Sequence, residues 1–195
     1  MIRTFVALDL PTDVQRDLAA FCAPLQKLDA AVSWIRPDRI HLTLKFLGNV
    51  EESAVEAIGD ALASAVETVR PFRLRPAGCG AFPSLREMRV LWVGVQGDLE
   101  PLMALHRRVE EALERLGFAK ENRPFRAHLT LGRVKGRRQL KALQEALTAR
   151  HTYQGVIFDV SEVVLYKSDL KPDGAQYTPL KRLPFRGGPE RSGEF

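Results

Sequence analysis

The chain has 195 residues, of which 45% are hydrophobic and 27% are charged, the balance of a soluble globular protein with a buried core. No apolar run approaches the roughly 20 residues that a membrane helix needs, so we expect no association with a membrane. The net charge of +5 suits a phosphate-bearing partner such as RNA, although composition alone does not establish one.

The first part of the chain alternates strand-like and helix-like patterns. Residues 2–10 are apolar and predict a strand that Pro11 ends. A helix is expected to begin there, with one apolar face formed by Leu18, Phe21, Cys22 and Leu25. The next predicted elements are a strand over 39–47, a helix over 51–69, strands over 72–74 and 89–95, and a helix over 99–116.

The second part of the chain repeats this alternation. It predicts a strand over 126–134, a helix over 139–149, one or two strands within 153–166, and a turn over 167–174. Residues 186–195 are polar and rich in glycine and predict a flexible C-terminal tail. We therefore expect an α+β fold in which residues 1–185 form a single bilobal domain. Two pseudo-symmetric antiparallel β-sheets would line a central cleft, with helices packed on the outside.

A short phrase occurs twice in the chain. Residues 37–44 read PDRIHLTL and residues 124–131 read PFRAHLTL, so six of eight positions are identical. Each copy lies on a predicted strand between two predicted helices. A repeat of this kind indicates a duplication of two similar lobes.

Strand geometry separates the side chains of each copy into two faces. The apolar positions of the two phrases, which would anchor both strands on the core, are Leu42, Leu44, Leu129 and Leu131. The polar positions share the opposite face: Arg39, His41, Thr43 and Lys45 in the first copy, and Arg126, His128 and Thr130 in the second. Packing requires only the apolar half of this pattern, so the repeated polar half indicates a site.

Two imidazoles that face each other across a cleft suit the chemistry of a phosphodiester. An imidazole has an ordinary pKa near 6.5, so one histidine can accept a proton while the other donates one. Threonine hydroxyls would hold the non-bridging oxygens, and nearby arginines would offset the negative charge that develops on them. His106 and His151 lie in no such motif and are interpreted as solvated or structural.

Four stretches of the chain resemble a known family in the expected order. They are RTFVALDLP near the start, WIRPDRIHLTLKFLGNV, PFRAHLTLGRVKG, and YKSDLKPDGAQYTPL near residue 180. Paired His-x-Thr-x tetrads are the signature of the 2H phosphoesterase superfamily. The surrounding stretches resemble the bacterial and archaeal RNA 2′,3′-cyclic phosphodiesterases, which are also called 2′-5′ RNA ligases.

The resemblance implies a bilobal fold and hydrolysis of a terminal 2′,3′-cyclic phosphate to a 2′-phosphate without a metal or cofactor. By position, His41 would protonate the O3′ leaving group and His128 would activate water. Thr43 and Thr130 would bind phosphate. Arg133 would contact it too, provided that the strand bulges near Gly132, since strand parity alone turns Arg133 away. Further substrate contacts are expected from Lys45 and Arg126.

Several alternatives remain open at the level of sequence. The same histidines would serve the reverse reaction, which joins a 2′,3′-cyclic end to a 5′-hydroxyl, or the opening of another cyclic phosphate such as one on ADP-ribose. A non-catalytic RNA-binding module is a third alternative. The expected partner is RNA with a 2′,3′-cyclic phosphate end, bound by a monomer. The two separated cysteines, Cys22 and Cys79, offer no zinc site and suit a reduced, cytoplasmic protein.

Overall fold

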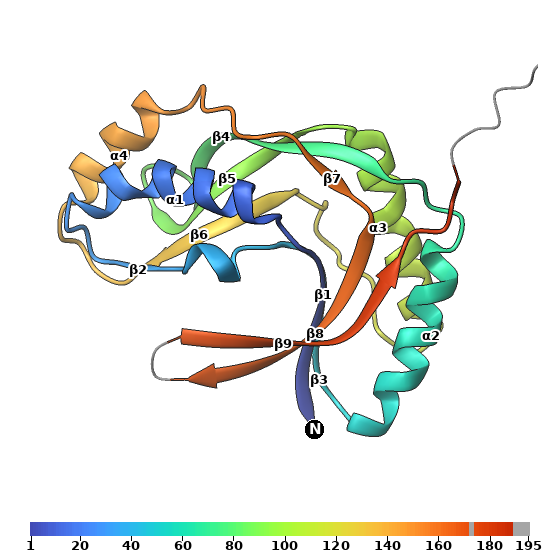
Figure 1. Cartoon of the computed structure of the whole chain (residues 1–195). Helices are drawn as coiled ribbons and strands as arrows, with labels where there is room; N and C mark the ends of the chain where they lie inside the picture. Colours follow the sequence, from blue (N-terminus) through green and yellow to red (C-terminus); the bar gives the residue numbers. More distant parts are fainter. Residues whose placement is uncertain (172–173, 189–195) are drawn as a thin grey trace, which may run out of the picture.

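The computed structural model describes residues 1–171 and 174–188 as an α+β fold with one curved antiparallel sheet and four α-helices (Figure 1). The helices are α1 (Thr12–Gln26), α2 (Val55–Val66), α3 (Leu99–Glu114) and α4 (Leu140–Ala149). The strands are β1 (Ile2–Leu8), β2 (Val32–Trp34), β3 (Leu42–Val50), β4 (Phe72–Pro83), β5 (Met88–Gly97), β6 (His128–Val134), β7 (Phe158–Val160), β8 (Glu162–Lys171) and β9 (Gly174–Pro184). Two single-turn 3₁₀ helices are also present: η1 (Pro37–Arg39) and η2 (Glu52–Ala54).

The sheet consists of two halves that meet at the repeated phrase. Its strand order is β7-β4-β5-β6-β3-β1-β8-β9, and β2 pairs with the outer part of β6. Between β3 and β6 the pairing narrows to one pair of residues, Leu42 with Leu129. The expected α+β class, antiparallel pairing and two-half arrangement are therefore confirmed, and the two predicted sheets are continuous through this narrow junction.

The helices cover one face of the sheet, and their apolar stripes form the core. On α1 the buried residues are Val14, Leu18, Phe21, Cys22 and Leu25, which include the face predicted from the periodicity. The α2 and α3 helices pack together beside the half that contains β1 and β3, while α4 packs on β4 (Figure 1). Leu42 and Leu129 are almost completely buried in this core, so the residues on either side of them point to the opposite face.

Two strands are not predicted by the sequence pattern. Both border the candidate active site described below. The segment around Trp34 forms β2, and the region after the predicted turn at 167–174 continues as β9. The β8 strand extends to Lys171, and residues 172–173 of that turn lie outside the described residues. Within the described ranges no helix is long and apolar enough to cross a membrane.

The predicted C-terminal tail is described only in part. Residues 186–188 are described, and the backbone N–H of Gly187 donates to the carbonyl of Val69 at 2.9 Å. Residues 189–195 lie outside the described residues.

Candidate active site

The narrow junction of the sheet brings the two tetrads together. Leu42 faces Leu129 in antiparallel register, so a step of one residue along each strand places His41 opposite Thr130 and Thr43 opposite His128. All four polar side chains are half-buried and lie on the face opposite the leucines. We call this surface of β3 and β6 the histidine face. A pseudo-two-fold axis through the leucine pair relates its two halves.

The two histidines are held by matching hydrogen bonds. The Nδ1 atom of His41 lies 3.0 Å from the carbonyl oxygen of Arg39, and that of His128 lies 2.6 Å from the carbonyl oxygen of Arg126. A carbonyl oxygen only accepts hydrogen bonds, so Nδ1 carries the proton in both rings. Nε2 of each ring is therefore the nitrogen left to exchange a proton with another molecule.

Aromatic rings enclose His41. It stacks on Phe5 with ring centroids 4.7 Å apart, and the ring of Tyr177 meets it edge-on at 5.1 Å. This burial lowers the pKa of His41 below its ordinary value, while the hydrogen bond to the Arg39 carbonyl and the negative charge of Asp9 act in the opposite direction. Burial thus favours the neutral imidazole, and the Arg39 carbonyl and the Asp9 carboxylate favour the protonated one.

His128 has a different set of neighbours. The ring of Phe82, on β4, lies edge-on to it with centroids 5.0 Å apart, and Trp92 packs against Phe82 at 5.3 Å. On β5, the residue paired with His128 is Gly94, which has no side chain. The two histidines therefore share their backbone geometry and their hydrogen bond but differ in what surrounds them.

A bulge at the same point of each copy reverses the strand parity just after the tetrads. In β3 the register with β1 shifts so that Val6 pairs with Lys45 and Ala7 with Thr43, which leaves one extra residue on β3. In β6 the register with β5 shifts in the same way: Gly132 pairs with Leu91 and Thr130 with Trp92, which leaves one extra residue on β6. After a bulge, the next residues exchange faces relative to simple alternation.

The bulge in β6 turns Arg133 toward the histidine face, as its predicted role required. Arg133 is exposed and pairs with Val90, two residues from the partner of Thr130 on β5. A side chain at position 132 would be crowded by β2, because a Cβ atom there would lie 2.8 Å from Cγ1 of Val32 and 3.0 Å from the carbonyl oxygen of Ser33. The corresponding residue of the first copy is Phe46, which is 58% exposed and contacts Phe5.

The bulge in β3 turns Lys45 away from the cleft, and its predicted role in substrate binding is wrong. Lys45 is only 3% exposed. Its Nζ atom donates to both carboxylate oxygens of Glu110 on α3 at 2.9 Å and to the carbonyl oxygen of Ala119 at 2.7 Å. The Lys45 side chain thus links β3 to α3 and to the loop that leads into β6.

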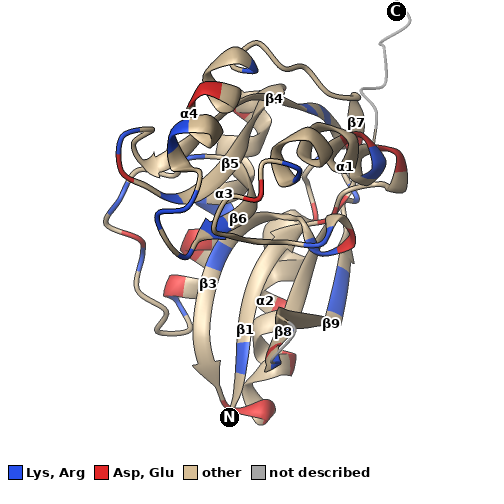
Figure 2. Ribbon diagram, turned by 90° about the vertical axis from the view of Figure 1, so that its left-hand side faces the viewer, with Lys and Arg blue, Asp and Glu red and all other residues tan. Residues whose placement is uncertain are grey.

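Lys and Arg occur on several of the strands and loops around the histidine face (Figure 2). Arg126 is exposed beside the second tetrad, and Arg39 donates to the carbonyl oxygen of Ala175 on β9 at 3.1 Å. Burial raises the pKa of the Tyr177 phenol, and this effect is partly opposed by the charges of three neighbours, Arg133, Arg3 and Arg39. Cations from both halves of the sheet thus lie around the Tyr177 ring that contacts His41.

The remaining histidines lie apart from this face. His106 stacks on Phe125 with ring centroids 4.0 Å apart, and burial lowers its pKa. His151 is exposed, and its Nδ1 donates to the carbonyl oxygen of Thr148. Across residues 1–171 and 174–188, no group of three or more His, Cys, Asp or Glu side chains is placed to hold a metal ion.

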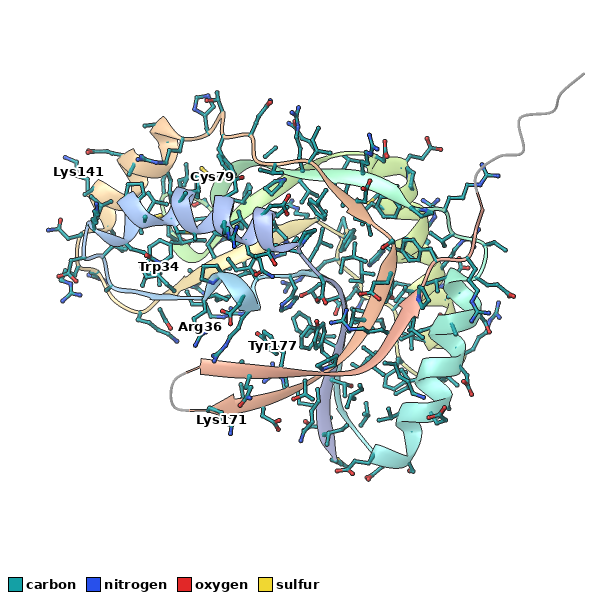
Figure 3. All side chains as sticks on the ribbon, viewed as in Figure 1. Trp34, Arg36, Cys79, Lys141, Lys171 and Tyr177 are labelled. Carbon is teal, nitrogen blue, oxygen red and sulfur yellow. The ribbon has the colours of Figure 1, made fainter. Side chains whose placement is uncertain are left out.

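Several residues near His41 could not be assigned to the site from the sequence pattern. A pocket of about 250 Å³ adjoins His41, and its lining includes Asp9, Tyr166, Tyr177 and Arg182. Figure 3 shows Tyr177 pointing from β9 toward the segment that carries Arg36. Alternation along residues 5–9 would have placed Phe5, Ala7 and Asp9 on one face, but an apolar strand gives no sign of which face borders a site. Tyr177 lies on a strand that the sequence pattern does not predict.

Comparison with known proteins identifies the family. Residues 10–172 match the model of the 2′-5′ RNA ligase superfamily. An RNA 2′,3′-cyclic phosphodiesterase of Methanothermobacter thermautotrophicus is 33% identical over 92% of this chain and 97% of its own, and one of Thermotoga maritima is 30% identical over 96% and 97%.

Solved structures agree with this result. The fold matches that of TT0787 from Thermus thermophilus with a TM-score of 0.76 and 27% identity, covering 95% of this chain and 99% of that one. It matches E. coli LigT complexed with 3′-AMP with a TM-score of 0.74 and 28% identity, covering 94% and 98%. These matches, the antiparallel fold and the paired tetrads at its centre together show that the chain belongs to the 2′-5′ RNA ligase superfamily.

Proposed function

We propose that this protein hydrolyses the terminal 2′,3′-cyclic phosphate of RNA to a 2′-phosphate, without a metal ion. The observation that carries the proposal is the paired constellation of the histidine face, in which each imidazole lies opposite the threonine of the other tetrad. The names of the relatives support the same substrate class. This scheme needs no metal ion, because the imidazoles transfer the protons and the hydroxyls and arginines stabilise the charge on the phosphate.

The two-fold arrangement fits an in-line displacement at phosphorus. Nε2 of His128 removes a proton from the attacking water as its oxygen bonds to phosphorus. His41 enters the step as the imidazolium ion, with protons on both ring nitrogens. The P–O3′ bond breaks on the opposite side, and the departing O3′ takes the proton from Nε2 of His41. The product carries a free 3′-hydroxyl and a 2′-phosphate, and return of a proton from His128 to His41 through solvent restores the starting state.

Charge on the transferred phosphate is offset by the flanking residues. In the strand register Thr43 lies opposite His128 and Thr130 lies opposite His41. Both hydroxyls can therefore donate to the non-bridging oxygens of the phosphate. Arg133 supplies a guanidinium from beyond Thr130, on the same face. Phe46 holds the equivalent place beyond Thr43, where its exposed ring offers a stacking surface to a base.

The first test is the product formed from a short RNA with a 2′,3′-cyclic phosphate end in the presence of EDTA. We expect a 2′-phosphate, at a rate equal to that without EDTA. A joined product with an added 5′-hydroxyl RNA would favour ligation, and binding without turnover would leave only an RNA-binding module. Loss of turnover in EDTA with recovery on adding Mg²⁺, Mn²⁺ or Zn²⁺ would contradict the metal-independent mechanism.

A second test compares Arg133→Ala with Arg126→Ala. Loss of the Arg133 guanidinium should lower kcat by roughly 10- to 100-fold as well as raise KM, because its contact strengthens as charge develops on the phosphate. Arg126→Ala should raise KM alone and flatten the salt dependence of binding, as expected for one lost backbone-phosphate contact. Steady-state kinetics at two salt concentrations measure both effects. A wild-type kcat in Arg133→Ala would make it a surface residue without a role at the phosphate.

A further inference from the structure

The pseudo-two-fold symmetry of the histidine face leaves the roles of the two histidines equivalent. Each ring has the same backbone hydrogen bond and the same threonine neighbour. A difference in proton affinity must therefore come from groups outside the repeated phrase. The two sides of the face differ most clearly in the strand that flanks each tetrad.

A carboxylate flanks His41. Leu8 of β1 pairs with Leu42 of β3, so the next residues along the two antiparallel strands, Asp9 and His41, lie opposite each other. Both residues line the pocket of about 250 Å³. His41 thus has Thr130 across one side of its strand and Asp9 across the other.

Contacts from two other strands hold this carboxylate in place. The hydroxyl of Tyr166, on β8, donates to Oδ1 of Asp9. Nη1 of Arg182, on β9, lies 3.1 Å from Oδ2 and also pairs with Glu162. Asp9 is therefore fixed by donors from β8 and β9 rather than left free in solvent.

The equivalent place beside His128 excludes any side chain. Its partner on β5 is Gly94, and a Cβ atom at this glycine would lie 2.9 Å from the carbonyl oxygen of Ala77. Backbone atoms do not give way as the end of a flexible side chain does, so this position accepts no carboxylate. His41 therefore has an anionic neighbour in Asp9, and the equivalent position beside His128 has none.

We infer that Asp9 is a positioning residue that stabilises the protonated form of His41 and thereby makes His41 the proton donor and His128 the proton acceptor. The inference rests on the proposed function, since it assigns the two roles within that reaction. An acid enclosed by Phe5 and Tyr177 needs such a neighbour, because burial favours the neutral ring.

Other groups that face His41 define the electrostatic background. They are Tyr166 from β8, Tyr177 and Arg182 from β9, and Asp38 and Arg39 from the preceding 3₁₀ helix. Arg182 is the cation that pairs with Asp9, so it reduces the effect of the carboxylate on the imidazole. The anionic phosphate of a bound substrate would add to the effect of Asp9 and favour proton uptake by His41.

An NMR titration of the imidazoles tests the inference without any turnover. In Asp9→Asn we expect the pKa of His41 to fall by about one pH unit, as when an opposite charge nearby is removed, with that of His128 unchanged. In Arg182→Gln the pKa of His41 should rise, because the carboxylate then acts without its counter-charge. Asp38→Asn is the matched control, since Asp38 lines the same pocket but pairs with Arg36. In this variant the pKa of His41 should change little. An unchanged pKa of His41 in Asp9→Asn would overturn the inference.

The pH profile of kcat/KM then separates donor from acceptor. A proton donor is active when protonated, so activity falls as pH rises through its pKa, and a lower pKa moves this alkaline limb to lower pH. Asp9→Asn should move the alkaline limb and leave the acidic limb in place. Movement of the acidic limb would identify His41 as the acceptor and overturn the assignment. If the wild-type protein hydrolysed no cyclic phosphate, the proposed function would fail while the NMR result still stood.

Discussion

His41→Ala and His128→Ala should each lower kcat by roughly two to four orders of magnitude while the protein stays folded, the usual range for loss of a general acid or base. Both rings present Nε2 to the same face, and no other histidine of the described chain lies there. Turnover of the cyclic phosphate by purified variants, with circular dichroism as the folding control, measures this effect.

Three further variants sharpen this result. His151→Ala removes an exposed histidine and should leave kcat unchanged. His106→Ala removes a ring that stacks on Phe125, so it should lower stability more than kcat. The double variant of His41 and His128 should be little worse than either single one, because residues that act as a unit are not additive. Near-normal turnover in either folded single variant would contradict the paired mechanism.

Lys45→Met should lower the free energy of unfolding by about 3–5 kcal/mol, the usual cost of leaving a buried charge without its partner. The carboxylate of Glu110 is 7% exposed and would retain the 3.2 Å hydrogen bond from the backbone N–H of Glu121. Methionine preserves most of the apolar volume of lysine, so the loss reports mainly on the charge. Urea denaturation at neutral pH gives the value.

The matched control is Arg73→Met, which breaks an ion pair on the surface. Arg73 and Asp159 are 73% and 71% exposed, and such pairs contribute about 0–1 kcal/mol. The double variant Lys45→Met with Glu110→Leu should recover much of the lost stability, because no buried charge remains. If Lys45→Met had normal stability and instead raised KM in a salt-dependent manner, Lys45 would be a substrate-binding residue.

Much of this molecule can be predicted from local sequence. The apolar periodicity of α1 identified Leu18, Phe21, Cys22 and Leu25 as a buried face, because a helix that covers a sheet must bury one stripe. The paired phrases placed their leucines in the core and their histidines on the other face, because alternation within a short strand depends on the backbone alone.

The residues around the histidines depended on partners distant in the chain. Tyr166, Tyr177 and Phe82 reach the rings from β8, β9 and β4, and nothing in their own local pattern distinguishes them from core residues. The placement of Asp9 beside His41 requires the register between β1 and β3. Register is set by the whole sheet rather than by either strand alone.

The sequence by itself therefore determined the duplication, the paired tetrads, the family resemblance and the faces of the repeated strands up to Thr43 and Thr130. Only the tertiary structure decided which way the side chains beyond those threonines point. Alternation predicted Lys45 in the cleft and left Arg133 dependent on a bulge, and bulges in both copies sent Lys45 to Glu110 and turned Arg133 to the histidine face. A bulge is a mismatch between two paired strands, so it belongs to the pair and is absent from the alternation of either one.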